Sequence, residues 1–217
     1  MKDQQIHEAV RILRQTVKAW EDPAVTQVAR RRDPYLVLIS CILSLRTQDE
    51  TTHQASQRLF NLAKGPGEMV RLSPEQVERA IYPVGFYRNK ARTILHISRT
   101  LLDKYGGRVP DELDEILTLK GVGRKTANLV VTLGYGKPGI CVDTHVHRIA
   151  NRWGYVATKT PEKTEFALRK KLPPQYWIEI NDMLVSFGQK ICRPLSPKCS
   201  TCPFRQYCER VGVTRNR

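Results

Sequence analysis

Residues 119–128, LKGVGRKTAN, join two segments of helical spacing through a tight Gly-Val-Gly turn. Glycine lets the backbone approach a ligand closely and adopt φ values that other residues avoid. A helix begins at this turn, so its free N–H groups and the positive end of its dipole are placed to hold a phosphate oxygen. A plain hairpin between two packed helices would show the same pattern.

Helical patterns extend from this turn in both directions over most of the chain. Residues 35–45 (YLVLISCILSL) are apolar nearly all round, which indicates a central buried helix. Asp49 and Thr51 are placed to cap the next helix, and Gly106 with Gly107 is placed to end a later one. The other predicted helices show the spacing of packed helices and cover residues 4–20, 49–62, 74–81, 89–105, 112–119, 124–135, 143–153, 162–171 and 176–191. Sustained strand-like alternation is absent, so we predict an all-α protein.

The charge balance is strongly basic. The chain has 36 Lys and Arg against 21 Asp and Glu, a formal net charge of +15. Such a chain attracts polyanions, of which nucleic acid is the commonest in the cytosol, although solubility or a heat-adapted surface would also account for the charge. No stretch approaches the roughly 20 apolar residues of a membrane helix, and residues 1–20 lack the apolar core of a signal peptide. We expect a cytoplasmic protein, or a nuclear one in a eukaryote, without membrane contact.

Four of the six cysteines form a C-x6-C-x2-C-x5-C loop near the end of the chain. In a reducing compartment such clustering indicates metal binding rather than disulfides. Structural zinc usually takes two short Cys pairs, whereas this loop has only one. The spacing therefore favours a [4Fe–4S] cluster, with zinc as the alternative and two disulfides as a weaker one. The four proposed ligands are Cys192, Cys199, Cys202 and Cys208.

Three cationic side chains, Arg193, Lys198 and Arg205, stand between these cysteines. A solvated or charge-balancing role beside an anionic thiolate centre would explain them. A rigid loop that presents cations at fixed positions also suits contacts with phosphate groups, and the two roles are compatible.

Lys125 lies in the first turn of the helix that follows the Gly-Val-Gly turn. The positive end of the helix and the neighbouring cations Lys120 and Arg124 favour a neutral amine there, and a neutral lysine is a nucleophile that can form a Schiff base. Asp143 follows 18 residues later (143 − 125) and could accept a proton or stabilise positive charge on a sugar ring. A solvated surface charge for Lys125 and a helix N-cap for Asp143 are the simpler interpretations.

Taken together, these residues resemble the endonuclease III family of DNA glycosylases, in the helix-hairpin-helix superfamily. The resemblance covers nearly the whole chain and rests on residues 119–128, on VDTH at residues 142–145 and on the cysteine loop, in the order and spacing of the family. It implies two helical domains with a DNA groove between them. A six-helix domain with the hairpin would span residues 26–137, and an iron–sulfur domain would combine residues 1–25 and 138–217.

The resemblance also implies a reaction. Lys125 would attack C1′ of an extruded, oxidised pyrimidine nucleotide with the help of Asp143, and the resulting Schiff base would allow strand cleavage 3′ to the abasic site by β-elimination. Gly121, Val122 and Gly123 would bind the DNA backbone. The partner would be double-stranded DNA that contains damaged bases or abasic sites, bound by a monomer. Relatives that only remove the base lack a lysine at this place.

Two further positions follow from the resemblance. Residues 85–91 (GFYRNKA) are similar to the family loop that inserts an apolar wedge into the duplex, with Phe86 as the wedge, although a core aromatic would fit the same pattern. Arg46 stands where many relatives have Gln, which enters the space vacated by the flipped nucleotide. Arginine would fill that space and donate hydrogen bonds to the orphaned base, so the preference for the opposite base stays open.

Two other functions are compatible with the residues. One is a monofunctional mismatch glycosylase of the same fold that acts on G·T or A·G pairs. The other is a non-catalytic DNA-binding module in which the hairpin and the basic loop only hold phosphate. The pair formed by Lys125 and Asp143 is the feature that such a module would not need.

Overall fold

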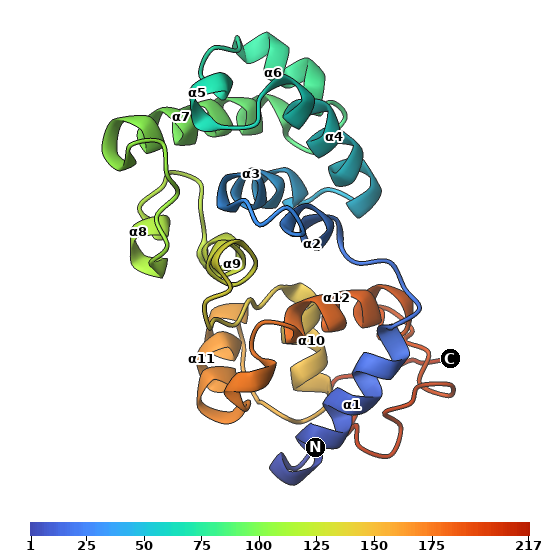
Figure 1. The fold of residues 1–217 in the computed structure, drawn as a ribbon. Coiled ribbons are helices and arrows are strands. Elements are labelled where there is room, and N and C mark those ends of the chain that lie inside the picture. Colours follow the sequence, from blue (N-terminus) through green and yellow to red (C-terminus); the bar gives the residue numbers. More distant parts are fainter. The chain divides into compact units, whose positions relative to one another are not determined.

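The chain folds entirely into helices and loops. We describe it from a computed structural model that covers residues 1–217, in which no strand is present (Figure 1). The all-α class predicted from the sequence is confirmed. The residues divide into two compact units, one formed by residues 1–23 with 138–217 and the other by residues 24–137. None of the helices combines the length and the apolar character that crossing a membrane requires.

The unit of residues 24–137 is organised around α3, which packs against its neighbours α2, α4, α7 and α9 and against the short π-helical segment η2 that continues α9. These neighbours come from both sides of α3 in the sequence. The elements are α2 (Ala24–Ala29), α3 (Pro34–Ser44), α4 (Asp49–Leu62), α5 (Pro66–Met69), α6 (Pro74–Ile81), α7 (Tyr87–Tyr105), α8 (Leu113–Leu117), α9 (Arg124–Leu129) and η2 (Val130–Gly134).

Helix α3 is the predicted central helix, and all residues from Tyr35 to Leu43 are buried. Burial of a single large aliphatic side chain stabilises a protein by about 1.5–3 kcal/mol, so the burial of α3 contributes strongly to the stability of its unit. Its start is fixed by Asp33, whose Oδ1 accepts hydrogen bonds from the backbone N–H groups of Tyr35 (2.9 Å) and Leu36 (3.2 Å). Pro34 occupies the first helical position, where its missing N–H costs nothing.

Several predicted boundaries agree with the structure, and others differ for identifiable reasons. Gly106 ends α7 with φ at +59°, as its place at the end of the helical pattern predicts. The short helices α2 and α5 were not predicted, because six and four residues carry too few apolar positions to reveal a period. The predicted caps of α4 are wrong: Gln48 is the N-cap, and Asp49 is the first helical residue.

The second unit is built on α1, α10, α11 and α12. Helix α12 packs against both α1 and α10, and α10 also contacts α11. After α12 the chain continues without helix to residue 217, and this segment contains the four clustered cysteines. The elements are η1 (Asp3–Gln5), α1 (Ile6–Val17), α10 (Thr144–Arg152), α11 (Pro161–Lys171), η3 (Pro174–Tyr176) and α12 (Ile180–Lys190).

An aromatic side chain anchors the cysteine segment to the core of this unit. Phe204 lies between Cys202 and Cys208 in the sequence and has no exposed surface. Its ring centroid lies 4.8 Å from that of Trp153 and 5.2 Å from that of Phe187. Aromatic pairs at such distances add to the area that they bury. The irregular segment is therefore held in place by packing as well as by its backbone.

The burial of α3 leads to a stability prediction. We expect Leu38→Ala, at a position without exposed surface, to lower the free energy of unfolding by about 2–5 kcal/mol through lost burial and a residual cavity. The matched control is Leu62→Ala on α4, where the side chain is 53% exposed, with an expected change within about 0.5 kcal/mol. Denaturant unfolding followed by circular dichroism measures both. Equal midpoints for the two variants would contradict a central role for α3.

Candidate functional site

The Gly-Val-Gly turn connects α8 to α9, and its two glycines are under different backbone and steric restrictions. Gly121 has φ at +85°, and a Cβ atom there would lie 2.9 Å from Cγ2 of Thr93, so the fold itself requires glycine. Gly123 is the N-cap of α9 with φ at −102°, and a Cβ atom there would meet nothing within 4 Å. Val122 between them is buried, so only its backbone faces outward. Glycine is a better helix N-cap than alanine, but no steric or backbone restriction within this chain requires it at position 123.

Lys125 is the second residue of α9 and is half-buried. Because the N-cap residue Gly123 has no side chain, it takes none of the first-turn N–H groups of α9, which are the groups that a helix leaves without internal partners. Lys120, on the other side of the turn, is exposed. The lysine therefore lies at a helix start that its own N-cap does not cover.

Asp143 is the N-cap of α10, as the simpler interpretation of this residue predicts. Its Oδ1 accepts hydrogen bonds from the backbone N–H groups of His145 (2.8 Å) and Val146 (2.9 Å). Both bonds end on the same oxygen, so Oδ2 takes no part in the cap. A capping role is thus compatible with a second role for the carboxylate. Asp143 belongs to the unit of residues 1–23 and 138–217, whereas Lys125 belongs to the other.

The four clustered cysteines line one small, largely apolar cavity together with Trp153, Phe187 and Ile191. All are free thiols. No three His, Cys, Asp or Glu side chains stand close enough to share a single metal ion. Burial raises the pKa of the Cys202 thiol to about 11, and it also raises the pKa of the Cys208 thiol. Thiolates gathered here would need a compensating positive charge, which iron or another thiophilic metal supplies.

Two arginines on α10 bind backbone carbonyls at the start of the cysteine loop, residues 192–194. Arg152 is 9% exposed and donates from Nη1 to the carbonyl oxygen of Arg193 (2.6 Å) and from Nη2 to that of Pro194 (2.7 Å). Arg148 donates from Nη2 to the carbonyl oxygen of Cys192 (2.8 Å). Their positions at i and i+4 place both on one face of α10. The sequence offered no signal for this role, because the acceptors are backbone carbonyls.

Lys198, predicted to contact DNA, is an exposed residue beside the same cavity. Its backbone N–H donates to the carbonyl oxygen of Ile191 at 3.1 Å, which closes the loop against the end of α12. The backbone from which this cation projects is therefore held against the end of α12.

Arg46 and Phe86, which the sequence placed in separate motifs, lie side by side in the unit of residues 24–137. The guanidinium carbon of Arg46 lies 5.7 Å from the centroid of the Phe86 ring. Phe86 is 62% exposed, so it is not a core aromatic. Both residues have left-handed backbones, with φ at +53° for Arg46 and +58° for Phe86. Residues other than Gly, Asn and Asp rarely adopt this backbone conformation. Residues strained in this way cluster at functional sites.

Comparisons with known proteins agree with this set of features. A family model described as HhH-GPD superfamily base excision DNA repair protein matches residues 39–174. Endonuclease III of Thermotoga maritima is 52% identical over 193 residues, which are 87% of this chain and 91% of that protein. The chain belongs to the endonuclease III family of the HhH-GPD superfamily. It is therefore a DNA glycosylase with AP lyase activity.

More distant members of the endonuclease III family extend the likeness. Endonuclease III-like protein 1 of Bos taurus is 42% identical over 190 residues, which are 86% of this chain and 61% of that longer protein. A solved structure described as a trapped endonuclease III–DNA covalent intermediate, in an estranged-adenine complex, is 32% identical. It covers 97% of each chain with a TM-score of 0.84.

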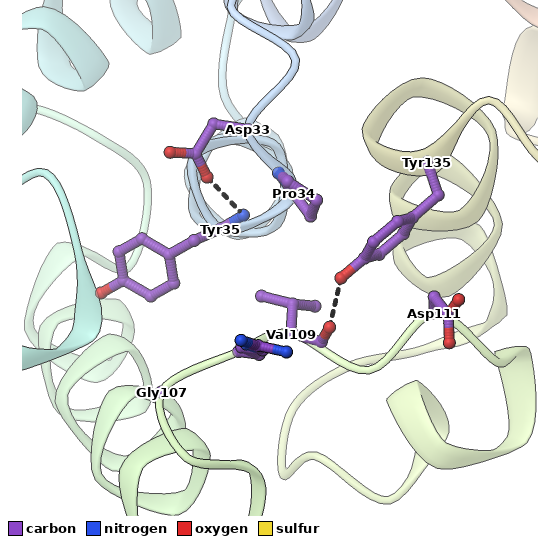
Figure 2. Close-up of a pocket in the computed structure, with 8 residues that line it drawn as sticks. Asp33, Pro34, Tyr35, Gly107, Val109, Asp111 and Tyr135 are labelled. Atoms are coloured by element: carbon purple, nitrogen blue, oxygen red, sulfur yellow. Dashed lines mark hydrogen bonds between the residues drawn. The ribbon is translucent and has the colours of Figure 1, made fainter.

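A larger pocket of the endonuclease III fold lies elsewhere in the unit of residues 24–137. It has a volume of about 500 Å³ and contains none of the predicted site residues. Figure 2 shows its polar groups in structural roles: Oδ1 of Asp33 caps α3, and the Tyr135 hydroxyl donates to the carbonyl oxygen of Val109. The lining residues are Asp33, Pro34, Tyr35, Gly107, Arg108, Val109, Asp111 and Tyr135.

Proposed function

We propose that the chain excises oxidised pyrimidines from double-stranded DNA and then cuts the strand 3′ to the abasic site. The observation that carries this proposal is Lys125, a lysine in the first turn of the helix that follows the Gly-Val-Gly turn. Members of the family that only remove the base lack a lysine there. The 32% identical solved structure holds a trapped covalent intermediate between an endonuclease III and DNA, which supports a covalent step for this chain too.

In the proposed reaction Nζ of Lys125 is the nucleophile. The neutral amine attacks C1′ of the flipped nucleotide, a new C–N bond forms, and the damaged base leaves with the electron pair of the broken bond and takes up a proton from water. The new ammonium group then gives up one proton and O4′ takes one up as the C1′–O4′ bond breaks, which opens the sugar ring and gives a protonated Schiff base. Loss of a C2′ proton then expels the 3′ phosphate by β-elimination. Each of these steps needs the lysine.

Asp143 is the proposed assistant to this chemistry. A carboxylate can accept the proton that the attacking amine loses, or stabilise the positive charge that develops on the sugar ring. Only Oδ1 is used by the N-cap of α10, so Oδ2 is the oxygen that we assign to this second role. The two functions use different atoms of one carboxylate.

The proposed DNA contacts come from three places in the chain. The backbone of residues 121–123 would receive a phosphate at the start of α9, and Lys198 would contact a second phosphate. Phe86 would enter the base stack while Arg46 meets the orphaned base. The net charge of +15 fits an extended polyanion as the partner. We further propose that the chain acts as a monomer in the cytoplasm or nucleus.

We also propose a [4Fe–4S] cluster held by the four clustered cysteines. The cysteine cavity fits such a group because four free thiols line it and its other walls are largely apolar. A bound cluster would cross-link the irregular segment after α12, and four Cys ligands leave no coordination site open for substrate. In this proposal the two compact units are the hairpin domain, which contains residues 26–137, and the iron–sulfur domain.

Lys125 provides the first test of this proposed function. We expect Lys125→Gln to abolish the covalent adduct that borohydride traps between the enzyme and abasic-site DNA, because the amide is not nucleophilic. Lys120→Gln is the control, since it removes an exposed cation from the same turn and should keep the adduct. Denaturing electrophoresis after borohydride treatment measures both. An intact adduct in Lys125→Gln would remove Lys125 from the mechanism.

The second prediction concerns Gly123. A methyl group at this position meets open space within the protein, so Gly123→Ala should cost only the preference of a helix N-cap for glycine over alanine, about 1 kcal/mol or less. The same methyl would push a phosphate away from the backbone, and we expect DNA affinity to fall by about tenfold, the equivalent of one lost charge-assisted hydrogen bond. Gly65→Ala is a matched control, because Gly65 is also an uncapped N-cap with open surroundings. Equal DNA affinities for the two variants would contradict the hairpin contact.

The third prediction concerns the cofactor. We expect the purified protein to be brown and to contain iron and acid-labile sulfide in equal amounts. Cys202→Ser should lower the iron content and the thermal midpoint together, because the segment after α12 loses its cross-link. Cys41→Ser, at a buried cysteine of the other unit, serves as the control and should keep the full iron content. A colourless protein with stoichiometric zinc would rule out the cluster.

A further inference from the structure

Lys90 on α7 is a buried lysine with no charged partner. Its residue surface is 7% exposed, and burial lowers the pKa of its amine to about 8. The amine nitrogen lies 2.8 Å from the carbonyl oxygen of Leu43, 2.5 Å from that of Leu45 and 3.1 Å from Oγ1 of Thr47. A lysine ammonium has three N–H donors, and here three acceptors surround it. Lysine is seldom buried, so the position calls for a specific reason.

The first reason is the end of α3. The last carbonyl groups of a helix have no partner within it, and in a helix as buried as α3 they cannot turn to water. The Ser44 hydroxyl donates to the carbonyl oxygen of Cys41 (2.9 Å), and the Thr47 N–H donates to that of Ser44 (3.2 Å). Lys90 supplies the donor for Leu43. A cation at this end also complements the negative end of the helix dipole.

The second reason is the loop that carries Arg46. Lys90 binds the carbonyl of Leu45 and the hydroxyl of Thr47, the residues on either side of Arg46. The backbone of Arg46 is left-handed, and a strained residue of this kind persists only where its surroundings hold it. The two bonds from Lys90 provide that restraint. Its side chain thus acts on the backbone of Arg46 without touching the guanidinium.

The third reason is the turn that carries Phe86. Lys90 lies one turn after Phe86 on α7, and its backbone N–H donates to the Phe86 carbonyl (3.0 Å). Gly85 connects the two loops, because its N–H donates to Oγ1 of Thr47 at 3.2 Å. A Cβ atom on Gly85 would lie 2.7 Å from the carbonyl oxygen of Arg46, so this close approach requires glycine. Lys90 and Thr47 therefore connect the loop that carries Arg46 to the turn that carries Phe86.

We propose that Lys90 is a positioning residue that holds Arg46 and Phe86 in one fixed arrangement and thereby sets the preference for the base opposite the lesion. This inference rests on the proposed roles of Arg46 and Phe86 in the duplex. When the loops are joined, the guanidinium can meet the orphaned base only in the geometry that the Phe86 ring allows. When they are not, Arg46 can adapt to any opposite base.

The test is Lys90→Met, which keeps an unbranched apolar stem and removes the three donors. The opposite-base spread is the ratio of the highest to the lowest kcat/KM among the four bases opposite the lesion. We expect Lys90→Met to reduce this ratio by about tenfold, the size that the loss of one anchoring hydrogen-bond group predicts. Borohydride trapping on abasic-site DNA should persist, since Lys125 is untouched. Ser98→Ala is the matched control, because it removes a different buried hydrogen bond, to the Tyr35 hydroxyl (2.7 Å), from the same helix. Its spread should stay at the wild-type value.

A double-mutant cycle separates positioning from general destabilisation. If Lys90 acts through Arg46, Lys90→Met should produce no further narrowing in an Arg46→Ala background. An additional narrowing of the same size in that background would overturn the proposal.

Hydrogen exchange provides a readout that does not depend on the proposed function. In Lys90→Met we expect the Gly85 amide to exchange at least about tenfold faster than in Ser98→Ala, because the loop that accepts its hydrogen bond is released. If Gly85 in Lys90→Met exchanges no faster than in Ser98→Ala and the opposite-base spread stays at the wild-type value, the proposed role of Lys90 is overturned. If Arg46→Ala alone leaves the opposite-base ranking unchanged, the proposed role of Arg46 fails instead.

A second variant covers the case in which Lys90→Met does not fold. Thr47→Val keeps the lysine and its two carbonyl bonds and removes only the hydroxyl that joins Lys90 to Gly85. We expect the same direction of change in the opposite-base spread and in Gly85 exchange. Wild-type values for both quantities in Thr47→Val would overturn the proposal.

Discussion

The burial of α3 is the constraint on which the unit of residues 24–137 depends. A helix that is apolar on every side can be surrounded by other helices, but its end groups must then find partners inside the protein. Asp33 meets this need at the start through its carboxylate. Lys90 meets it at the other end, where the chain leaves the core and turns at Arg46. The requirement for hydrogen bonds at a buried helix end therefore places a cation directly behind a candidate DNA-contacting loop.

The unit of residues 1–23 and 138–217 contains a long irregular segment that must be held by contacts with its helices. The chain after α12 forms no helix, so its position depends on side chains from elsewhere. Phe204 packs between Trp153 and Phe187, while Arg148 and Arg152 bind backbone carbonyls of the same segment. Because both arginines lie on α10, the helix that Asp143 caps is also the helix that holds the cysteine loop.

Three glycines in this chain show how one residue type serves different purposes. Gly121 is required by its positive φ and by the nearby Thr93, and Gly85 by the close approach of the Arg46 carbonyl. Gly123 meets no such restriction within the protein. The proposed reason for its missing side chain is the close approach of a DNA phosphate. Substitution of Gly123 therefore tests DNA binding with little effect on folding.

The helical class, the central helix, the cysteine loop and the family could all be predicted from the chain, since each depends on local patterns: period, composition and spacing. Helices α4 and α6 were predicted at their observed bounds for the same reason. Only the folded chain shows that Arg46 lies beside Phe86, that Arg152 holds the cysteine loop and that Lys90 is buried. These contacts join residues 40 or more positions apart. Their acceptors are mostly backbone carbonyls, which every residue possesses, so no pattern of side chains could reveal them.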